Sequence, residues 1–65
     1  MITVNGKEIA ITEPLTIEAF LEQNHYQMKR IAVEMNGEII PKSSYSSVIL
    51  HSGDKLEVVS FVGGG

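Results

Sequence analysis

The last three residues, Gly63, Gly64 and Gly65, form the part of the sequence with the clearest chemical potential. Extended glycines advance about 3.3–3.6 Å each and carry no side chain, so three of them can thread about 10 Å into a narrow channel. The carboxylate that would end such a tail is ionised at neutral pH and is an oxygen nucleophile that can attack the α-phosphate of ATP. The resulting adenylate is a mixed anhydride, which a sulfur or amine nucleophile can open. We therefore predict that Gly65 is the modified residue and that Gly63 and Gly64 carry it into partner active sites.

Simpler explanations of a terminal glycine run remain open. A frayed end, a cloning scar or a linker stub would also be rich in glycine, because glycine disfavours order. Glycine makes up about 7% of average protein sequences, so chance accounts poorly for three in succession at a chain end. Loss of function on removal of Gly64 and Gly65 would distinguish a working tail from these alternatives.

Two Asn-Gly pairs predict the β-hairpins that must support this tail. Asn5-Gly6 and Asn36-Gly37 each follow an alternating apolar strand, and Asn-Gly suits the two positive-φ positions of a type I′ turn. The predicted hairpin strands are 2–4, 7–11, 31–35 and 38–40.

A short helix is predicted between the hairpins. Ile17, Phe20 and Leu21 have the spacing of one helical face. Thr16 is the expected N-cap, and Asn24 is expected to end the helix in the left-handed conformation. Two turns do not persist alone, so this helix must pack on the sheet.

The second half of the chain completes an α+β roll. Pro41 ends a strand because it lacks an amide hydrogen, and the polar segment 42–47 is expected to contain a short helical turn. A strand at 48–50 leads to a Gly53-Asp54 turn, and the last strand runs from 55 to 62. We expect one domain at 1–62 and a flexible glycine tail at 63–65.

Composition restricts the possible partners. The 65 residues have a net charge of −3, which disfavours nucleic acid and anionic membranes, and no apolar run approaches a membrane span. There is no cysteine and no signal peptide pattern, so the cytoplasm is the expected location. His25 and His51 lack the spacing of metal ligands, and no metal site is predicted.

One face of the last strand is predicted to dock partners. Val59 and Phe61 alternate in phase with Lys55 and Glu57, the charged and hence solvent-facing side of the strand. Two apolar side chains are therefore left outside beside the tail. Ala32, on a neighbouring strand, is expected to widen this patch.

Three segments of the sequence resemble those of a known family. They are Ala-Val-Glu-Met-Asn-Gly-Glu-Ile-Ile-Pro at 32–41, Gly-Asp-Lys-Leu-Glu at 53–57, and the Gly-Gly end. In these motifs the chain resembles the ThiS family, the sulfur carrier proteins of thiamin thiazole biosynthesis. The resemblance implies a ubiquitin-like β-grasp fold, a mixed sheet of about five strands packed on one short helix. It also implies that the first and last strands lie parallel at the centre of the sheet.

The resemblance further implies a carrier that is not itself an enzyme and binds no cofactor. An adenylyltransferase like ubiquitin-activating enzymes would adenylate Gly65 with ATP and magnesium. Sulfur from a persulfide of a cysteine desulfurase would then give a C-terminal thiocarboxylate, and thiazole synthase would receive the sulfur. The free carrier is expected to be a monomer. Gly63 stands where relatives often have another small residue.

Three alternatives stay open. The small subunit of molybdopterin synthase also carries a thiocarboxylate, but it is usually longer and has a proline-bearing aromatic stretch that Phe61-Val62 lacks. A ubiquitin-like modifier would instead join Gly65 to a lysine of a target protein. A plain binding module would have no use for the tail.

Overall fold

The computed structural model describes residues 1–12 and 14–61. The elements follow one another as β1 (Ile2–Val4), β2 (Lys7–Ile9), β3 (Leu15–Thr16), α1 (Ile17–Gln23), η1 (Met28–Arg30), β4 (Ile31–Met35), β5 (Glu38–Ile40), η2 (Lys42–Ser44), β6 (Ile49–Leu50) and β7 (Lys55–Ser60). Within these described ranges, no helix is both long and apolar enough to cross a lipid bilayer.

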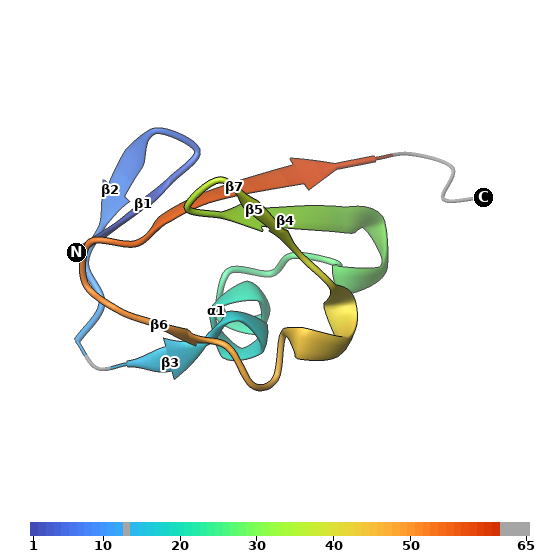
Figure 1. The fold of residues 1–65 in the computed structure, drawn as a ribbon, viewed down its shortest axis with the longest axis horizontal. Helices are drawn as coiled ribbons and strands as arrows, with labels where there is room; N and C mark the ends of the chain where they lie inside the picture. Colours follow the sequence, from blue (N-terminus) through green and yellow to red (C-terminus); the bar gives the residue numbers. More distant parts are fainter. Residues whose placement is uncertain (13, 62–65) are drawn as a thin grey trace.

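Five strands form one mixed sheet in the order β2-β1-β7-β4-β5 (Figure 1). β1 pairs in parallel with β7, where Thr3 lies opposite Lys55, and β7 pairs antiparallel with β4. The last strand is therefore central, with a neighbour on each side. Both the mixed five-stranded sheet and the parallel pairing of the first and last strands confirm the expected arrangement.

Both Asn-Gly turns adopt the predicted conformation. Asn5 and Gly6 have φ values of 51° and 83°, and Asn36 and Gly37 have 53° and 88°. Two consecutive positive φ values define the type I′ turn, whose twist matches that of the flanking strands. The registers Val4↔Lys7 and Met35↔Glu38 place each pair at the tip of a two-residue hairpin.

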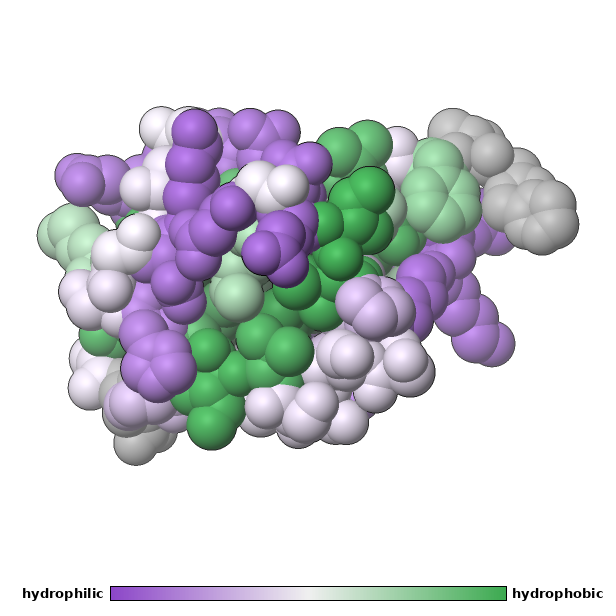
Figure 2. All heavy atoms as spheres, viewed as in Figure 1, coloured by the Kyte–Doolittle hydropathy of each residue, from purple (hydrophilic) through white to green (hydrophobic). Residues whose placement is uncertain are grey.

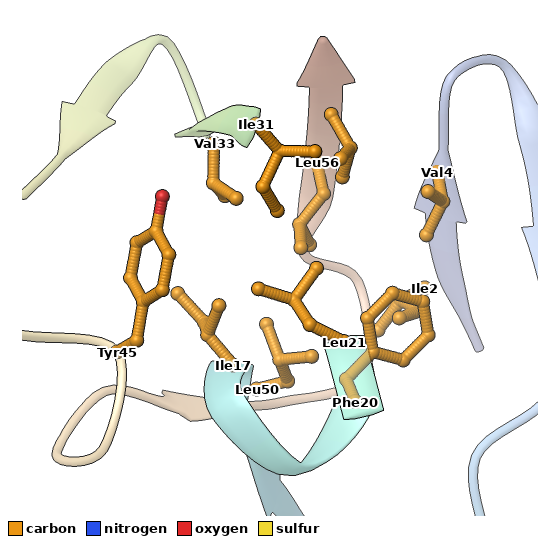
Figure 3. Close-up of a cluster of buried hydrophobic side chains, with 11 residues drawn as sticks. Ile2, Val4, Ile17, Phe20, Leu21, Ile31, Val33, Tyr45, Leu50 and Leu56 are labelled. Carbon is orange, nitrogen blue, oxygen red and sulfur yellow. The ribbon is translucent and has the colours of Figure 1, made fainter. Parts of the chain in front are cut away.

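The core lies between α1 and the inner face of the five-stranded sheet. Figure 3 shows Ile17 and Leu21 on the helix pointing toward Val33 and Leu56 on the strands, and all four side chains are fully buried. Thr16 is the N-cap as predicted, because its hydroxyl oxygen accepts a hydrogen bond from the Ala19 amide at 3.1 Å. A seven-residue helix is too short to persist alone, so this packing stabilises it.

The end of α1 differs from the prediction for Asn24. Asn24 has φ −102° and ψ 13°, and His25 takes the left-handed position with φ 63°. The His25 amide donates to the Glu22 carbonyl at 3.2 Å, and the Tyr26 amide donates to the Leu21 carbonyl at 2.9 Å. These are the two bonds of a Schellman motif, which requires the left-handed residue one position after the C-cap.

The strand predicted at 7–11 ends at Ile9, because Ile9 pairs with Ile2 and no residue of β1 remains beyond it. The chain then leaves the sheet and forms β3, which sequence reasoning missed. β3 pairs with β6 in a separate two-stranded sheet, where Leu15 lies opposite Leu50. The helical turn predicted after Pro41 is confirmed as η2. The last strand, predicted to run from 55 to 62, ends at Ser60, and Val62 lies outside the described residues.

Candidate functional site

The candidate site lies where β7 leaves the sheet. Phe61 follows β7, and its amide donates to the Arg30 carbonyl at 2.9 Å, which extends the β4–β7 ladder by one residue. Gly63, Gly64 and Gly65 lie outside the described residues, so their predicted roles stay predictions. The described chain fixes the position from which the tail departs, because Phe61 is bonded to a neighbouring segment of the central sheet.

An exposed apolar surface covers the sheet beside this point. Val59 is 57% exposed and Phe61 is 41% exposed. Ala32 is also exposed, and it lies directly opposite Val59 in the β4–β7 register. The structure thus brings the three predicted patch residues together on the outer face, which confirms their exposure and proximity. Their docking role remains a prediction.

Sequence reasoning missed a fourth apolar residue of this surface. Ile39 is 77% exposed, and it shares a groove of about 160 Å³ with Ala32 and Val59. The adjacent pair Ile39-Ile40 could have indicated it. Consecutive residues of a strand point to opposite faces, so in a sheet covered on one face one of the two isoleucines is exposed. We refer to Ala32, Ile39, Val59 and Phe61 as the sheet patch.

Figure 2 shows apolar side chains interrupting the hydrophilic surface in a band that crosses the middle of the molecule. Two carboxylates border the sheet patch, because Glu34 and Glu57 line the same groove as its residues. They lie directly opposite each other in the β4–β7 register. At the tail end, the Lys42 ammonium lies 5.6 Å from the centre of the Phe61 ring, which is within the range of a cation–π contact. The patch is therefore framed by opposite charges.

Two asparagine side chains hold β7 in place. The Asn5 amide donates to the Val58 carbonyl at 3.1 Å, and its oxygen accepts from the Val58 amide at 2.8 Å. The side chain thus replaces a strand partner beyond the end of β1. On the other side, the Asn36 oxygen accepts from the Lys55 amide at 2.9 Å. Both asparagines come from the type I′ turns, so the turns also position the strand that precedes the tail.

Other features of the described chain lie apart from the sheet patch. Residues 1–12 and 14–61 contain no group of three or more His, Cys, Asp or Glu side chains that could hold a metal ion. A larger cavity of about 340 Å³ lies beside α1 and the segment after β2, lined by residues that include Ile11, Phe20 and Gln23. Burial raises the pKa of the Tyr45 phenol, which lies in the core and not at the sheet patch.

The family model described as the ThiS family matches residues 2–65. A sulfur carrier protein ThiS of Bacillus subtilis is 39% identical over 66 residues, which span the whole of both chains. The crystal structure of a thiamine biosynthesis protein (ThiS) from Geobacter metallireducens superposes with a TM-score of 0.85, at 31% identity, and covers 98% of this chain and 97% of that one. This likeness supports the ubiquitin-like β-grasp assignment of the sheet and helix described above.

A further relative is a longer protein. A thiazole synthase of Paramagnetospirillum magneticum is 45% identical over 64 residues, which cover 98% of this chain but 20% of that protein. The chain therefore spans about one fifth of the length of that relative.

Proposed function

The chain belongs to the ThiS family, and from this premise we propose that it is a sulfur carrier protein of thiamin biosynthesis. The observation that carries the proposal is the match to the Bacillus subtilis carrier across the whole of both chains. In this function the protein is a co-substrate of partner enzymes, which supply the catalytic groups. The exposed sheet patch beside the end of β7 supports a role in docking those enzymes.

The first proposed step activates the tail. A Gly65 carboxylate oxygen attacks the α-phosphate of magnesium-bound ATP, forms a new P–O bond and releases pyrophosphate. The ATP and magnesium belong to the active site of an adenylyltransferase like ubiquitin-activating enzymes. Gly63 and Gly64 let the chain reach that site, because a thread of glycines is no wider than the backbone.

The second proposed step loads the sulfur. The terminal sulfur of a partner persulfide, formed by a cysteine desulfurase, attacks the Gly65 carbonyl carbon and displaces AMP. A partner thiol then cleaves the S–S bond, which leaves a thiocarboxylate on Gly65 and a disulfide on the partner side. The chain has no cysteine, so both sulfur groups must come from partners.

Thiazole synthase is the proposed sulfur acceptor. The support is that two thiazole synthases, from Paramagnetospirillum magneticum and Magnetococcus marinus, each contain a segment similar to this chain. A carrier domain and an acceptor enzyme that work in succession benefit from a link between them, because the link raises their effective concentration.

The test is the intact mass of the protein isolated from its own cells during thiamin starvation, without reductive or alkaline treatment. We expect a form in which one oxygen is replaced by sulfur. Deletion of Gly65 should abolish this form, whereas the matched variant Gly63→Ala, which keeps the end of the chain, should retain it. A ladder of larger conjugates would contradict the proposal and support a protein modifier instead.

A further inference from the structure

The two Asn-Gly pairs of the chain combine neighbouring groups that can react with each other. Asparagine is thermolabile because the next backbone nitrogen can attack its side-chain carbonyl carbon, and a following glycine has no side chain to shield that nitrogen. Asn5-Gly6 and Asn36-Gly37 both lie at exposed hairpin tips. Apart from the chain neighbours, no described atom lies within 4 Å of the place where a side chain would begin on either glycine. Solvent therefore reaches both pairs.

Hydrogen bonds restrain both carboxamides. The Asn5 carboxamide bonds the amide and the carbonyl of Val58, at 2.8 and 3.1 Å. The Asn36 oxygen accepts from the Lys55 amide at 2.9 Å, and its side-chain nitrogen donates to an Asp54 carboxylate oxygen at 3.1 Å. Each carboxamide must give up these bonds before its carbon can reach the nitrogen of the following glycine. Folding therefore slows the reaction at both pairs.

The two restraints differ in exposure. Both bonds of Asn5 are partly buried and end on the backbone of Val58, in the central strand β7. Both bonds of Asn36 are exposed, and one of them ends on the Asp54 side chain, which can rotate away. Water can replace the partner of an exposed group, whereas a buried group that loses its partner stays unsatisfied at a cost. The Asn36 carboxamide is therefore released more often than that of Asn5.

We propose that Asn36 is a site of spontaneous deamidation and is modified before Asn5. The Gly37 nitrogen forms a bond to the side-chain carbonyl carbon of Asn36, and the bond from that carbon to the side-chain nitrogen breaks. Ammonia leaves with the Gly37 amide proton, and a cyclic succinimide remains. Solvent water then opens the ring at either carbonyl, which gives aspartate or isoaspartate at position 36. The reaction does not depend on the proposed sulfur transfer.

Deamidation removes a contact that positions the start of β7. The carboxylate that replaces the Asn36 carboxamide has no hydrogen to donate to Asp54, so two negative charges meet where one hydrogen bond was. The isoaspartate product also adds one carbon to the main chain of a two-residue turn, which disturbs the Met35↔Glu38 register. Because Asn36 also bonds the Lys55 amide, both products weaken the anchoring of the strand that leads to the tail.

The test follows both pairs in one sample of the purified protein, incubated for several weeks at neutral pH. Peptide mapping by mass spectrometry measures the fraction of aspartate and isoaspartate at each position. In the folded protein we expect Asn36 to deamidate at least about fivefold faster than Asn5, which is the ratio expected for one extra hydrogen bond that must be lost. In concentrated guanidinium chloride the restraints are absent, and the two rates should agree within about twofold. Equal rates in the folded protein, or a faster Asn5, would overturn the proposal.

A variant of Asp54 tests the local restraint. Asp54→Ala removes the acceptor of the Asn36 side-chain nitrogen, so we expect deamidation of Asn36 to accelerate about fivefold. Asn5 is the reference within the same molecule, and its rate should stay within about twofold of the parent because its bonds to Val58 are unchanged. Equal acceleration at both positions would show that the reaction passes through unfolding of the whole domain, which contradicts local release of Asn36.

Variants that imitate the product test its effect on stability. We expect Asn36→Asp to lower the urea midpoint of unfolding, and the double variant Asn36→Asp, Asp54→Asn to recover most of this loss, because the exchange restores one donor and one acceptor. The control Gln27→Glu makes the same change of amide to carboxylate at an exposed residue whose side chain does not cap η1, and it should leave the midpoint unchanged. An Asn36→Asp protein as stable as Gln27→Glu would overturn the proposed weakening of β7.

Discussion

At the scale of single residues, the asparagines of the type I′ turns do more than reverse the chain. Asn5 tolerates φ 51° and also bonds both the amide and the carbonyl of Val58. β1 ends at Val4, so without this side chain the parallel edge of β7 would be unpaired beyond Leu56. One side chain therefore completes the pairing of the strand that leads to the tail.

The contribution of Asn5 can be measured with two variants. We expect Asn5→Gly, which relieves the positive φ but loses both side-chain hydrogen bonds, to lower the free energy of unfolding by about 1–2 kcal/mol. Asn5→Ala should cost about 1 kcal/mol more, because alanine also resists a left-handed backbone. Urea unfolding followed by circular dichroism measures both. If Asn5→Gly is as stable as the parent, the bonds to Val58 contribute no net stability.

A second prediction at this scale concerns Phe61. We expect Phe61→Ser to weaken adenylation about tenfold and to change the free energy of unfolding by less than about 0.5 kcal/mol, because an exposed ring contributes little to folding. Ile49→Ser is the matched control. Ile49 is 46% exposed but lies on β6, in the separate two-stranded sheet, so its variant should be adenylated normally. A loss of stability alone in Phe61→Ser would show that the ring is a structural contact.

At the scale of elements, the helix is stabilised at both ends by local bonds. Thr16 caps its first turn, and the Schellman motif at His25 satisfies its last carbonyls. Asn24 donates its side-chain amide to the Phe20 carbonyl at 2.9 Å, which is one more satisfied group at this end. The chain can then turn toward η1 and the start of β4, which lies beside β7.

His25 is strained in this motif, because only glycine adopts a left-handed backbone without cost. We therefore expect His25→Gly to raise the free energy of unfolding by about 0.5–1 kcal/mol, and His25→Val to lower it by about 1 kcal/mol. Thermal unfolding of the two variants measures the difference. Asn24→Gly is the control: Asn24 has negative φ, so this change should destabilise the protein. If Asn24→Gly stabilises the protein instead, Asn24 and not His25 adopts the left-handed conformation.

At the scale of the whole molecule, the β-grasp arrangement places the buried core and the sheet patch on opposite faces of one sheet. The helix and the inner face of the sheet enclose the core, whereas the outer face carries the sheet patch. Because β7 is central, its inner residues Leu56 and Val58 are buried, while Val59 faces outward next to the tail. Residues of the sheet patch can therefore be changed without opening the core.

The core also predicts how stability depends on pH. Burial raises the pKa of the Tyr45 phenol above its usual 10.0, so the folded protein keeps this proton to higher pH than the unfolded chain. The stabilisation is complete below about pH 10 and is lost as the pH rises through the folded pKa. We expect urea stability to fall more steeply above pH 10 in the parent than in Tyr45→Phe. Parallel curves for the two proteins would contradict a buried Tyr45.

The sequence by itself determined the features that depend on neighbours along the chain. Asn-Gly favours a type I′ turn, alternation in β7 separates Val59 from the core, and Thr16 can cap only the helix that follows it. These preferences act over a few residues, so the order of the amino acids is enough to predict them. The parallel pairing at the centre of the sheet was implied by family resemblance and not by spacing.

The tertiary structure alone decided what depends on distant partners. β3 has two residues and no sequence signal of its own, and it exists because β6 lies beside it. Ile39 is outside and Ile40 is inside because the β4–β5 register sets the face. Arg30, Lys42 and Phe61 come from three segments far apart in sequence, and only the completed sheet brings the Arg30 carbonyl and the Lys42 ammonium to Phe61.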